Sequence, residues 1–192
     1  MGVTLEVSLF FDKKERKAKA MEKGMIRVGW IALALMEVAF LTLPFRSAIL
    51  PPTLKVIKSL VGEWVEVGPH GKVGSNIVSS YSLTSGGTAI REVIFPGSDH
   101  EMITMYSLEG DDVLLTHFCI LGNTPKYRAK LQGDNRLVYE CLGGANISSE
   151  NEKHMHWGSV KIVDPDHIQT EWLQFENGKE THKVSLNLVR KE

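Results

Sequence analysis

Ten short segments of β-forming residues lie between positions 61 and 190, and turn-forming residues separate each segment from the next. The separators are clusters of Gly, Asn, Asp, Ser and Pro, such as Ser85-Gly86-Gly87, Pro96-Gly97-Ser98-Asp99 and Glu176-Asn177-Gly178. The predicted strands cover residues 61–67, 75–83, 88–95, 101–108, 113–120, 127–131, 137–141, 156–163, 168–175 and 182–190.

Connections this short restrict the topology, because parallel strands need long crossover segments. The ten segments therefore predict an all-β, antiparallel, up-and-down meander. A meander of this many strands tends to curl and close, which removes its exposed edges. We expect a β-barrel of about ten strands, with a two-sheet sandwich as the alternative. A short helix is expected just before the first strand, because Leu54, Ile57 and Leu60 repeat at helical spacing after Thr53.

The first 53 residues differ in character from this β-rich region. Residues 1–25 are rich in lysine and form a basic extension, and residues 26–48 contain an apolar run long enough to cross a bilayer, interrupted by Glu37. Positive charge before an apolar run is typical of a signal peptide or a signal-anchor helix. Residues 49–53, with Pro51-Pro52, are expected to be a stiff linker, and residues 54–192 the barrel. This pattern predicts a protein exported to the periplasm or outside the cell, or anchored by its N-terminal helix, with a buried helix as the alternative.

Net charge and cysteine content indicate which partners and cross-links to expect. A formal net charge of -1 argues against a nucleic-acid partner, which usually meets a basic face. The chain has two cysteines, Cys119 and Cys141, and a predicted strand lies between theirs in the meander. We therefore expect two free thiols rather than a disulfide. Apolar residues on both faces of strand 113–120 fit a wall packed on both sides or a homodimer contact.

Histidine and cysteine pairs are the first candidates for chemistry. His117 and Cys119 are two apart on one predicted strand, and His154 and His156 are two apart near another, so each pair shares a face. Zn or Cu can use such pairs. Because the pairs lie far apart in sequence, a structural or hydrogen-bonding role is favoured over metal. A Cys–His nucleophile is disfavoured, since strand residues two apart are separated by about 6.5–7 Å.

Several segments resemble a lipocalin-like β-barrel domain family of unknown function within the calycin superfamily, mainly bacterial. Gly62-Glu63-Trp64 looks like the Gly-x-Trp signature of lipocalins, in which an arginine of the last strand, here Arg190, packs over the tryptophan. The other similar segments are Met105-Tyr106-Ser107-Leu108-Glu109-Gly110-Asp111, Leu115-Thr116-His117-Phe118-Cys119, Gly122-Asn123-Thr124-Pro125, Asp166-His167-Ile168, Glu171-Trp172 and Asn177-Gly178-Lys179-Glu180. The resemblance covers roughly residues 54–191 and implies a barrel with an internal cavity, without naming a ligand.

The function expected from these features is non-catalytic binding of a small, largely hydrophobic molecule in the barrel. Alternatives are an enzyme or a haem- or metal-binding protein that uses cavity histidines, and a filled barrel with a structural or interaction role. No catalytic residue, metal ligand or cofactor is assigned. The candidate ligand-binding residues are Tyr106, His117, Cys119, Asn123, Arg128, His154, His156, Glu171 and Trp172.

Overall fold

The computed structural model describes residues 50–192. The basic extension and the apolar segment expected over residues 1–48 lie outside the described residues, so both remain predictions. Within the described part of the chain, no helix has the length and apolar character required to cross a bilayer.

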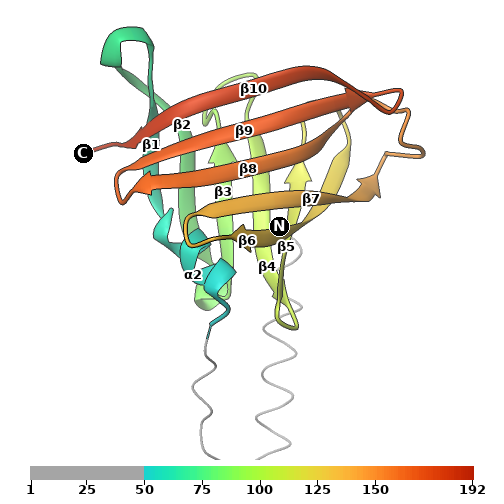
Figure 1. Cartoon of the computed structure of the whole chain (residues 1–192), viewed down its shortest axis with the longest axis horizontal. Coiled ribbons are helices and arrows are strands. Elements are labelled where there is room, and N and C mark those ends of the chain that lie inside the picture. Colours follow the sequence, from blue (N-terminus) through green and yellow to red (C-terminus); the bar gives the residue numbers. More distant parts are fainter. Residues whose placement is uncertain (1–49) are drawn as a thin grey trace, which may run out of the picture. The chain divides into compact units, whose positions relative to one another are not determined.

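The described chain is one short helix followed by ten strands (Figure 1). Two single-turn 3-10 segments, Pro69–Gly71 and Ser85–Gly87, lie in the first two connections between strands. The elements are α2 (Pro52–Ser59), β1 (Gly62–Val67), β2 (Val73–Thr84), β3 (Ala89–Ile94), β4 (Met102–Glu109), β5 (Asp112–Phe118), β6 (Thr124–Gln132), β7 (Arg136–Ala145), β8 (His154–Asp164), β9 (His167–Glu176) and β10 (Lys179–Arg190).

All ten strands form a closed antiparallel barrel, which confirms the predicted topology. Each strand pairs with its neighbours in sequence, and β1 closes the barrel by pairing with β10, with Trp64 opposite Arg190. In Figure 1, β8, β9 and β10 run crosswise to β2, β3 and β4, as expected when a strongly twisted sheet folds back on itself. Closure gives each of these ten strands a paired neighbour on both sides.

Helix α2 and one end of the barrel form a single packed unit. Leu54 and Ile57 of the helix and Leu60 just after it are almost completely buried. The hairpin connections β2–β3, β4–β5, β6–β7 and β8–β9 lie at this end, because the strands alternate in direction from β1 onward. We call it the closed end, and the opposite end the open end.

The predicted contact between Arg190 and Trp64 is present at the closed end. The Arg190 guanidinium lies 4.5 Å from the centroid of the buried Trp64 ring and donates hydrogen bonds to the carbonyls of Ser59, Val61 and Pro165. Gly62 has a φ of +137°, and a Cβ there would lie 2.5 Å from Arg190 Nη1. The glycine of Gly-x-Trp is therefore required by both its backbone angle and the space that the arginine occupies.

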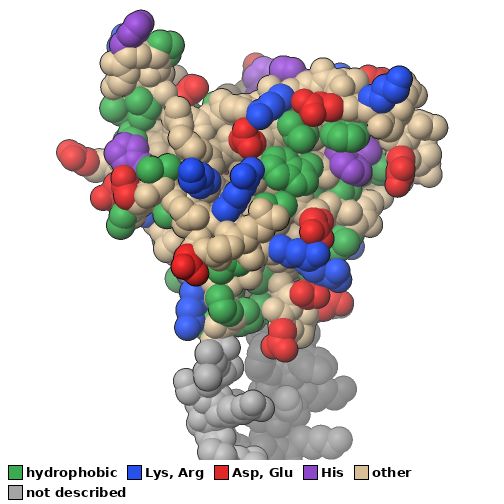
Figure 2. Space-filling model, viewed as in Figure 1, with side chains coloured by type: hydrophobic (Ala, Val, Ile, Leu, Met, Phe, Trp, Pro, Cys, Tyr) green, Lys and Arg blue, Asp and Glu red, His purple; other side chains and the backbone are tan. Residues whose placement is uncertain are grey.

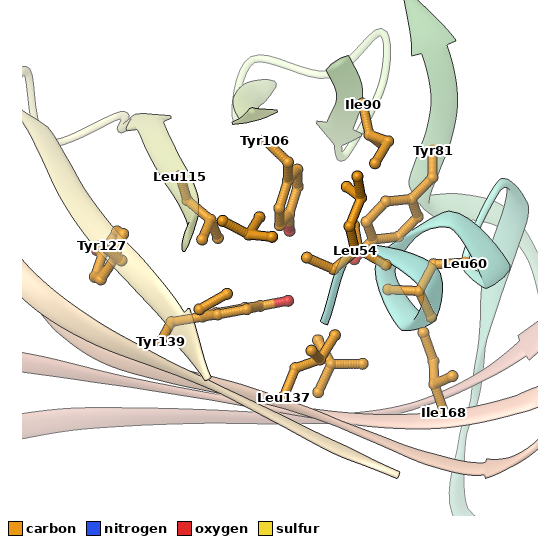
Figure 3. Packing of buried hydrophobic residues seen from close by; sticks show 14 of the residues in the cluster. Leu54, Leu60, Tyr81, Ile90, Tyr106, Leu115, Tyr127, Leu137, Tyr139 and Ile168 are labelled. Carbon is orange, nitrogen blue, oxygen red and sulfur yellow. The ribbon is translucent and has the colours of Figure 1, made fainter. Parts of the chain in front are cut away.

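Large side chains fill the half of the barrel nearest the closed end (Figure 3). Leu54 and Leu60 point into the same cluster as Tyr81, and the ring of Tyr106 lies 6.3 Å from Tyr81 and 6.2 Å from Tyr139 between centroids. Such tilted and edge-to-face pairs are the favoured aromatic arrangements. This half of the barrel is a packed core rather than a cavity.

The alternation expected for β8 is broken by a bulge. The β8–β9 register shifts between Met155 and Trp157, which leaves His156 without an opposite residue in the ladder. Met155, rather than His156, lines the barrel interior together with Val160. His154 and His156 therefore do not share the inner face with Val160, because one extra residue reverses the phase of everything before it.

Candidate ligand-binding cavity

A cavity of about 200 Å³ occupies the half of the barrel nearest the open end. Strands β2 to β5 and β8 to β10 contribute its walls, together with Phe95 of the β3–β4 connection and the β5–β6 turn. Most of the wall is apolar, including Val78, Ile94, Met102, Met155, Val160, Val184, Leu186 and Leu188. Its mouth must lie at the open end, since both of these connections are there.

A buried carboxyl group is the main polar feature of the cavity wall. Glu92 of β3 is 5% exposed and accepts hydrogen bonds from Ser79 Oγ at 2.8 Å and from Tyr106 Oη at 2.6 Å. Burial raises the pKa of Glu92, while the hydroxyl donors around it lower it in part. A carboxylate has about four acceptor positions, so Glu92 can accept a further hydrogen bond from a molecule in the cavity.

The imidazole ring of His117, in β5, also lies in the cavity wall, where it is uncharged and held by neighbouring side chains. Its Nδ1 is 2.9 Å from Thr104 Oγ1 on β4, and its ring stacks on Trp172 of β9 with 5.8 Å between centroids. Burial lowers the pKa of His117 to about 4, so the imidazole is uncharged at neutral pH. The side chain offers hydrogen bonding without placing a positive charge in an apolar space.

Trp172 spans the interior from β9, and its position depends on a glycine in β8. Gly158 lies opposite Trp172 in the ladder, and a Cβ at Gly158 would lie 2.6 Å from atoms of the indole ring. The ring also meets Tyr127 and Tyr139, with centroids 5.7 and 5.6 Å away. Trp172 therefore forms the boundary between the filled half and the cavity.

The mouth carries exposed apolar side chains. Ile120 and Leu121 of the β5–β6 turn line the cavity, yet Ile120 is 52% exposed. The turn is closed by hydrogen bonds from Cys119 N to Asn123 O and from Gly122 N to Cys119 O, and Gly122 adopts the left-handed region with a φ of +80°. An apolar rim of this kind suits the entry of an apolar ligand.

Four of the nine predicted ligand-binding residues line the cavity: Tyr106, His117, Cys119 and Trp172. Arg128 and Glu171 lie elsewhere and form ion pairs: Arg128 Nε is 3.0 Å from Asp112, and Glu171 meets both Arg136 and Lys183. Asn123 is buried and donates to the carbonyl of Lys153. The last two, His154 and His156, hydrogen-bond to each other where β7 and β8 separate.

Both cysteines are free thiols, as predicted, and both are partly buried. Burial raises the pKa of each thiol, so both are protonated at neutral pH. Cys119 lies at the cavity mouth, whereas Cys141 lies beside His154 and His156. Among the described residues, the cysteine that lies with His154 and His156 is Cys141.

Sequence reasoning missed the buried carboxyl group. Glu92 and Ser79 are polar, and polar residues of a strand are usually assigned to its solvent-facing side. The pairing of Ser79 with Ile94 and of Tyr81 with Glu92 across β2 and β3 puts Glu92 inward beside Tyr81. A sign of this was available, because Glu92 shares its strand phase with Ile90 and Ile94.

The surface over β8, β9 and β10 contrasts with the cavity. Figure 2 shows acidic and basic side chains interspersed over this face, with no area given over to one sign. Glu171 pairs there with Arg136 on one side and Lys183 on the other.

A comparison with protein-family models and a comparison with curated proteins each find no match to this chain. The site must therefore be interpreted from its own chemistry. A mostly apolar, partly enclosed space with one carboxyl group and one neutral imidazole can hold an apolar molecule and orient one polar group on it.

Proposed function

We propose that this protein binds a small, largely hydrophobic molecule in the cavity of its barrel and catalyses no reaction on it. The observation that carries the proposal is the cavity itself, an apolar space with the Glu92 carboxyl group in its wall. Glu92 keeps acceptor capacity beyond its two hydrogen bonds, and a polar group buried without full compensation lowers stability, so a hydrogen-bonding ligand would offset this cost.

We also propose that the barrel is of the lipocalin-like, calycin type. The support is the up-and-down closure of ten strands with a short helix before β1. Further support is the arrangement of Gly62, Trp64 and Arg190 at the closed end, where the guanidinium covers the indole ring. Barrels of this size hold one small ligand or are filled by side chains.

The size of the cavity limits the ligand. Pockets for drug-sized molecules measure about 300–1,000 Å³. A cavity of about 200 Å³ is smaller. At the packing density of protein interiors, it suits a molecule of on the order of ten non-hydrogen atoms. Longer ligands would extend through the mouth past Ile120 and Leu121.

The polar part of the ligand is expected to be a hydrogen-bond donor. Ser79 and Tyr106 already donate to Glu92, so the remaining need of the carboxylate is for another donor. A carboxylate acceptor makes a hydrogen bond roughly twice as strong as a neutral acceptor does. Ligands with an N–H or O–H group should therefore bind more tightly than hydrocarbons of the same shape.

Indole and indene provide a matched test of this proposal, because they share a shape and only indole has an N–H donor. Binding of each to the purified full-length chain is measured at pH 8 by saturation-transfer NMR and calorimetry. We expect both to bind, with indole about tenfold tighter, as one hydrogen bond to a charged group contributes about 1.5 kcal/mol. In Glu92→Gln the advantage of indole should shrink while indene binding stays the same.

Failure of both probes to bind would contradict the cavity as a ligand site. If both probes bind with equal affinity, and if their affinities are the same in Glu92→Gln, the cavity is a ligand site but Glu92 does not orient the ligand. Chemical conversion of either probe would contradict the non-catalytic part of the proposal.

For the N-terminal region, we propose export or membrane anchoring through residues 26–48, with contact to membrane through this segment alone. The apolar run after lysine-rich residues 1–25 supports this proposal. We expect no nucleic-acid partner. Cell fractionation with N-terminal sequencing of the mature chain tests the location, and a full-length chain in the soluble cytoplasmic fraction would contradict it.

A further inference from the structure

Strands β7 and β8 separate toward the open end of the barrel. Their ladder runs from Arg136 opposite Lys161 to Glu140 opposite Trp157 and then stops, although both strands continue in pairing with their other neighbours. Side chains of β6 and the turn before it reach β8 and the residue before it: Tyr127 Oη donates to Met155 O at 2.6 Å, and Asn123 Nδ2 donates to Lys153 O at 2.8 Å. These bonds satisfy backbone carbonyls where the ladder between β7 and β8 is absent. The separation of the two strands is therefore stabilised by specific side chains.

Three metal-ligating side chains converge in this opening. The Cys141 sulfur and a ring nitrogen from each of His154 and His156 all lie within 4.8 Å of one another. His154 Nε2 and His156 Nδ1 are 2.9 Å apart. His156 lies at the β8 bulge, where the register with β9 shifts between Met155 and Trp157, and His154 lies two residues before it.

Neighbouring groups already orient two of the three side chains. His154 Nδ1 lies 2.6 Å from the carbonyl oxygen of Glu152, which can only accept, so Nδ1 carries the proton and Nε2 presents its lone pair to the cluster. This is the usual support for a metal-binding histidine, whose second nitrogen donates to a carbonyl or carboxylate. The backbone N–H of Gly143 points to Cys141 Sγ at 3.4 Å, which would stabilise a thiolate.

We propose that Cys141, His154 and His156 bind one Zn²⁺ ion in the opening between β7 and β8. Imidazole and thiolate are the ligands that zinc prefers, and three protein ligands leave a fourth position open. Ligand atoms around tetrahedral zinc are about 3.5 Å apart, given bond lengths of about 2.0–2.3 Å. Small side-chain rotations bring the present atoms to that spacing.

The connection between the two strands ends directly before His154. Glu150 lies in that connection, and its charge acts on both Cys141 and His156. A carboxylate there can take the fourth position itself or hold a zinc-bound water. The site therefore has two negative groups, the thiolate and Glu150, to balance the two charges of the ion.

Zinc binding at this site requires that the three ligand atoms carry no proton. Cys141 gives up its thiol proton as the sulfur–zinc bond forms. The proton now shared between His154 and His156 moves to the other nitrogen of His156, whose Nδ1 then binds the ion. One proton leaves per zinc bound, so calorimetry in buffers of different ionisation enthalpy should detect one proton released.

The test is zinc titration of the full-length chain after chelator treatment, with a chromophoric zinc chelator as competitor. We expect one zinc per chain for the wild-type protein. Cys141→Ser and His156→Asn should each weaken binding more than about 100-fold, since loss of a supporting group alone costs about 10–100-fold. Cobalt(II) in place of zinc should give a thiolate-to-cobalt charge-transfer band that Cys141→Ser removes.

Cys119→Ser and His182→Asn are the matched controls, because each removes the same kind of side chain outside the cluster. Both should bind zinc within about twofold of the wild-type protein. Zinc binding that survives Cys141→Ser and His156→Asn, or that is lost equally in Cys119→Ser, would overturn the proposal, as would a wild-type chain that binds none. The site does not depend on the cavity ligand, so a barrel with its cavity filled should still bind zinc.

Discussion

The same ten strands form the wall of both halves of the barrel, but the interiors of the two halves differ. At the closed end, α2 and the rings of Trp64, Tyr81 and Tyr139 form a packed core. At the open end, smaller side chains such as Val184 leave a cavity of about 200 Å³. Ten paired strands thus specify only the wall, and the size of the inward side chains decides whether the interior is core or cavity.

The polar groups of the two halves differ in the same way. Arg190 at the closed end is fully committed to backbone carbonyls, the Asp166 carboxylate and the Trp64 ring. Glu92 in the cavity wall retains acceptor capacity beyond its bonds to Ser79 and Tyr106. The closed half should therefore determine stability, and the open half should determine binding.

The largest expected effect is loss of the Trp64 ring. Trp64→Ala should lower the free energy of unfolding by about 3–5 kcal/mol, because it leaves a cavity under Arg190 in the packed half. Denaturant unfolding at pH 7 measures this. Trp157→Ala is the control, since Trp157 is partly exposed and should cost about 1 kcal/mol. Equal losses would mean that the closed half is no special source of stability.

His117 should make stability depend on pH in acid solution. Burial lowers its pKa from 6.5 to about 4, so between these values the unfolded chain binds the proton and the folded chain does not. Stability from this group is complete above pH 6.5 and falls as the pH drops toward 4, by about 3 kcal/mol in total. The difference in unfolding free energy between the wild-type protein and His117→Gln should shrink over this window. A constant difference from pH 7 to 4 would contradict a buried neutral imidazole.

Arg190 should contribute less than Trp64, on which it packs. Arg190→Met keeps much of the packing but loses the cation–π contact, the bonds to three carbonyls and the exposed ion pair with Asp166, at a cost of about 2 kcal/mol. Thermal and denaturant unfolding measure the change. Indole affinity should stay within about twofold, because the cavity is in the other half. A loss of indole affinity without a loss of stability would contradict the assignment of stability to the closed half and of binding to the open half.

Filling the cavity should change stability least and binding most. Val184→Phe places a ring in the cavity and should alter the free energy of unfolding by about 1 kcal/mol or less while abolishing indole binding. Val73→Phe is the control, because Val73 is 55% exposed on β2 and does not line the cavity. Unchanged indole binding in Val184→Phe would place the ligand elsewhere.

The wall was predictable from sequence because turn residues act locally. Each predicted strand corresponds to an observed one, and the contact of Arg190 with Trp64 followed from the resemblance of Gly62-Glu63-Trp64 to a known signature. The ends of the predicted strands differ from those of the observed strands by a few residues. Strand β6, for example, begins at Thr124 rather than at Tyr127.

The interior was predictable only in part, because it depends on contacts between distant strands. Tyr106, His117, Cys119 and Trp172 line one cavity, whereas Glu92 was missed because its burial depends on its neighbours in β2 and β4. The bulge at His156 has no sequence signal, since no Gly or Pro marks it. The cluster with Cys141 was therefore out of reach of alternation alone.

Native mass spectrometry of the full-length chain, purified from its own host, tests the central claim most directly. The wild-type protein should carry a small apolar molecule that dissociates on activation, and Val184→Phe, purified in the same way, should carry none. A wild-type chain that emerges without any bound molecule, or a Val184→Phe variant that retains the same one, would contradict binding in the cavity.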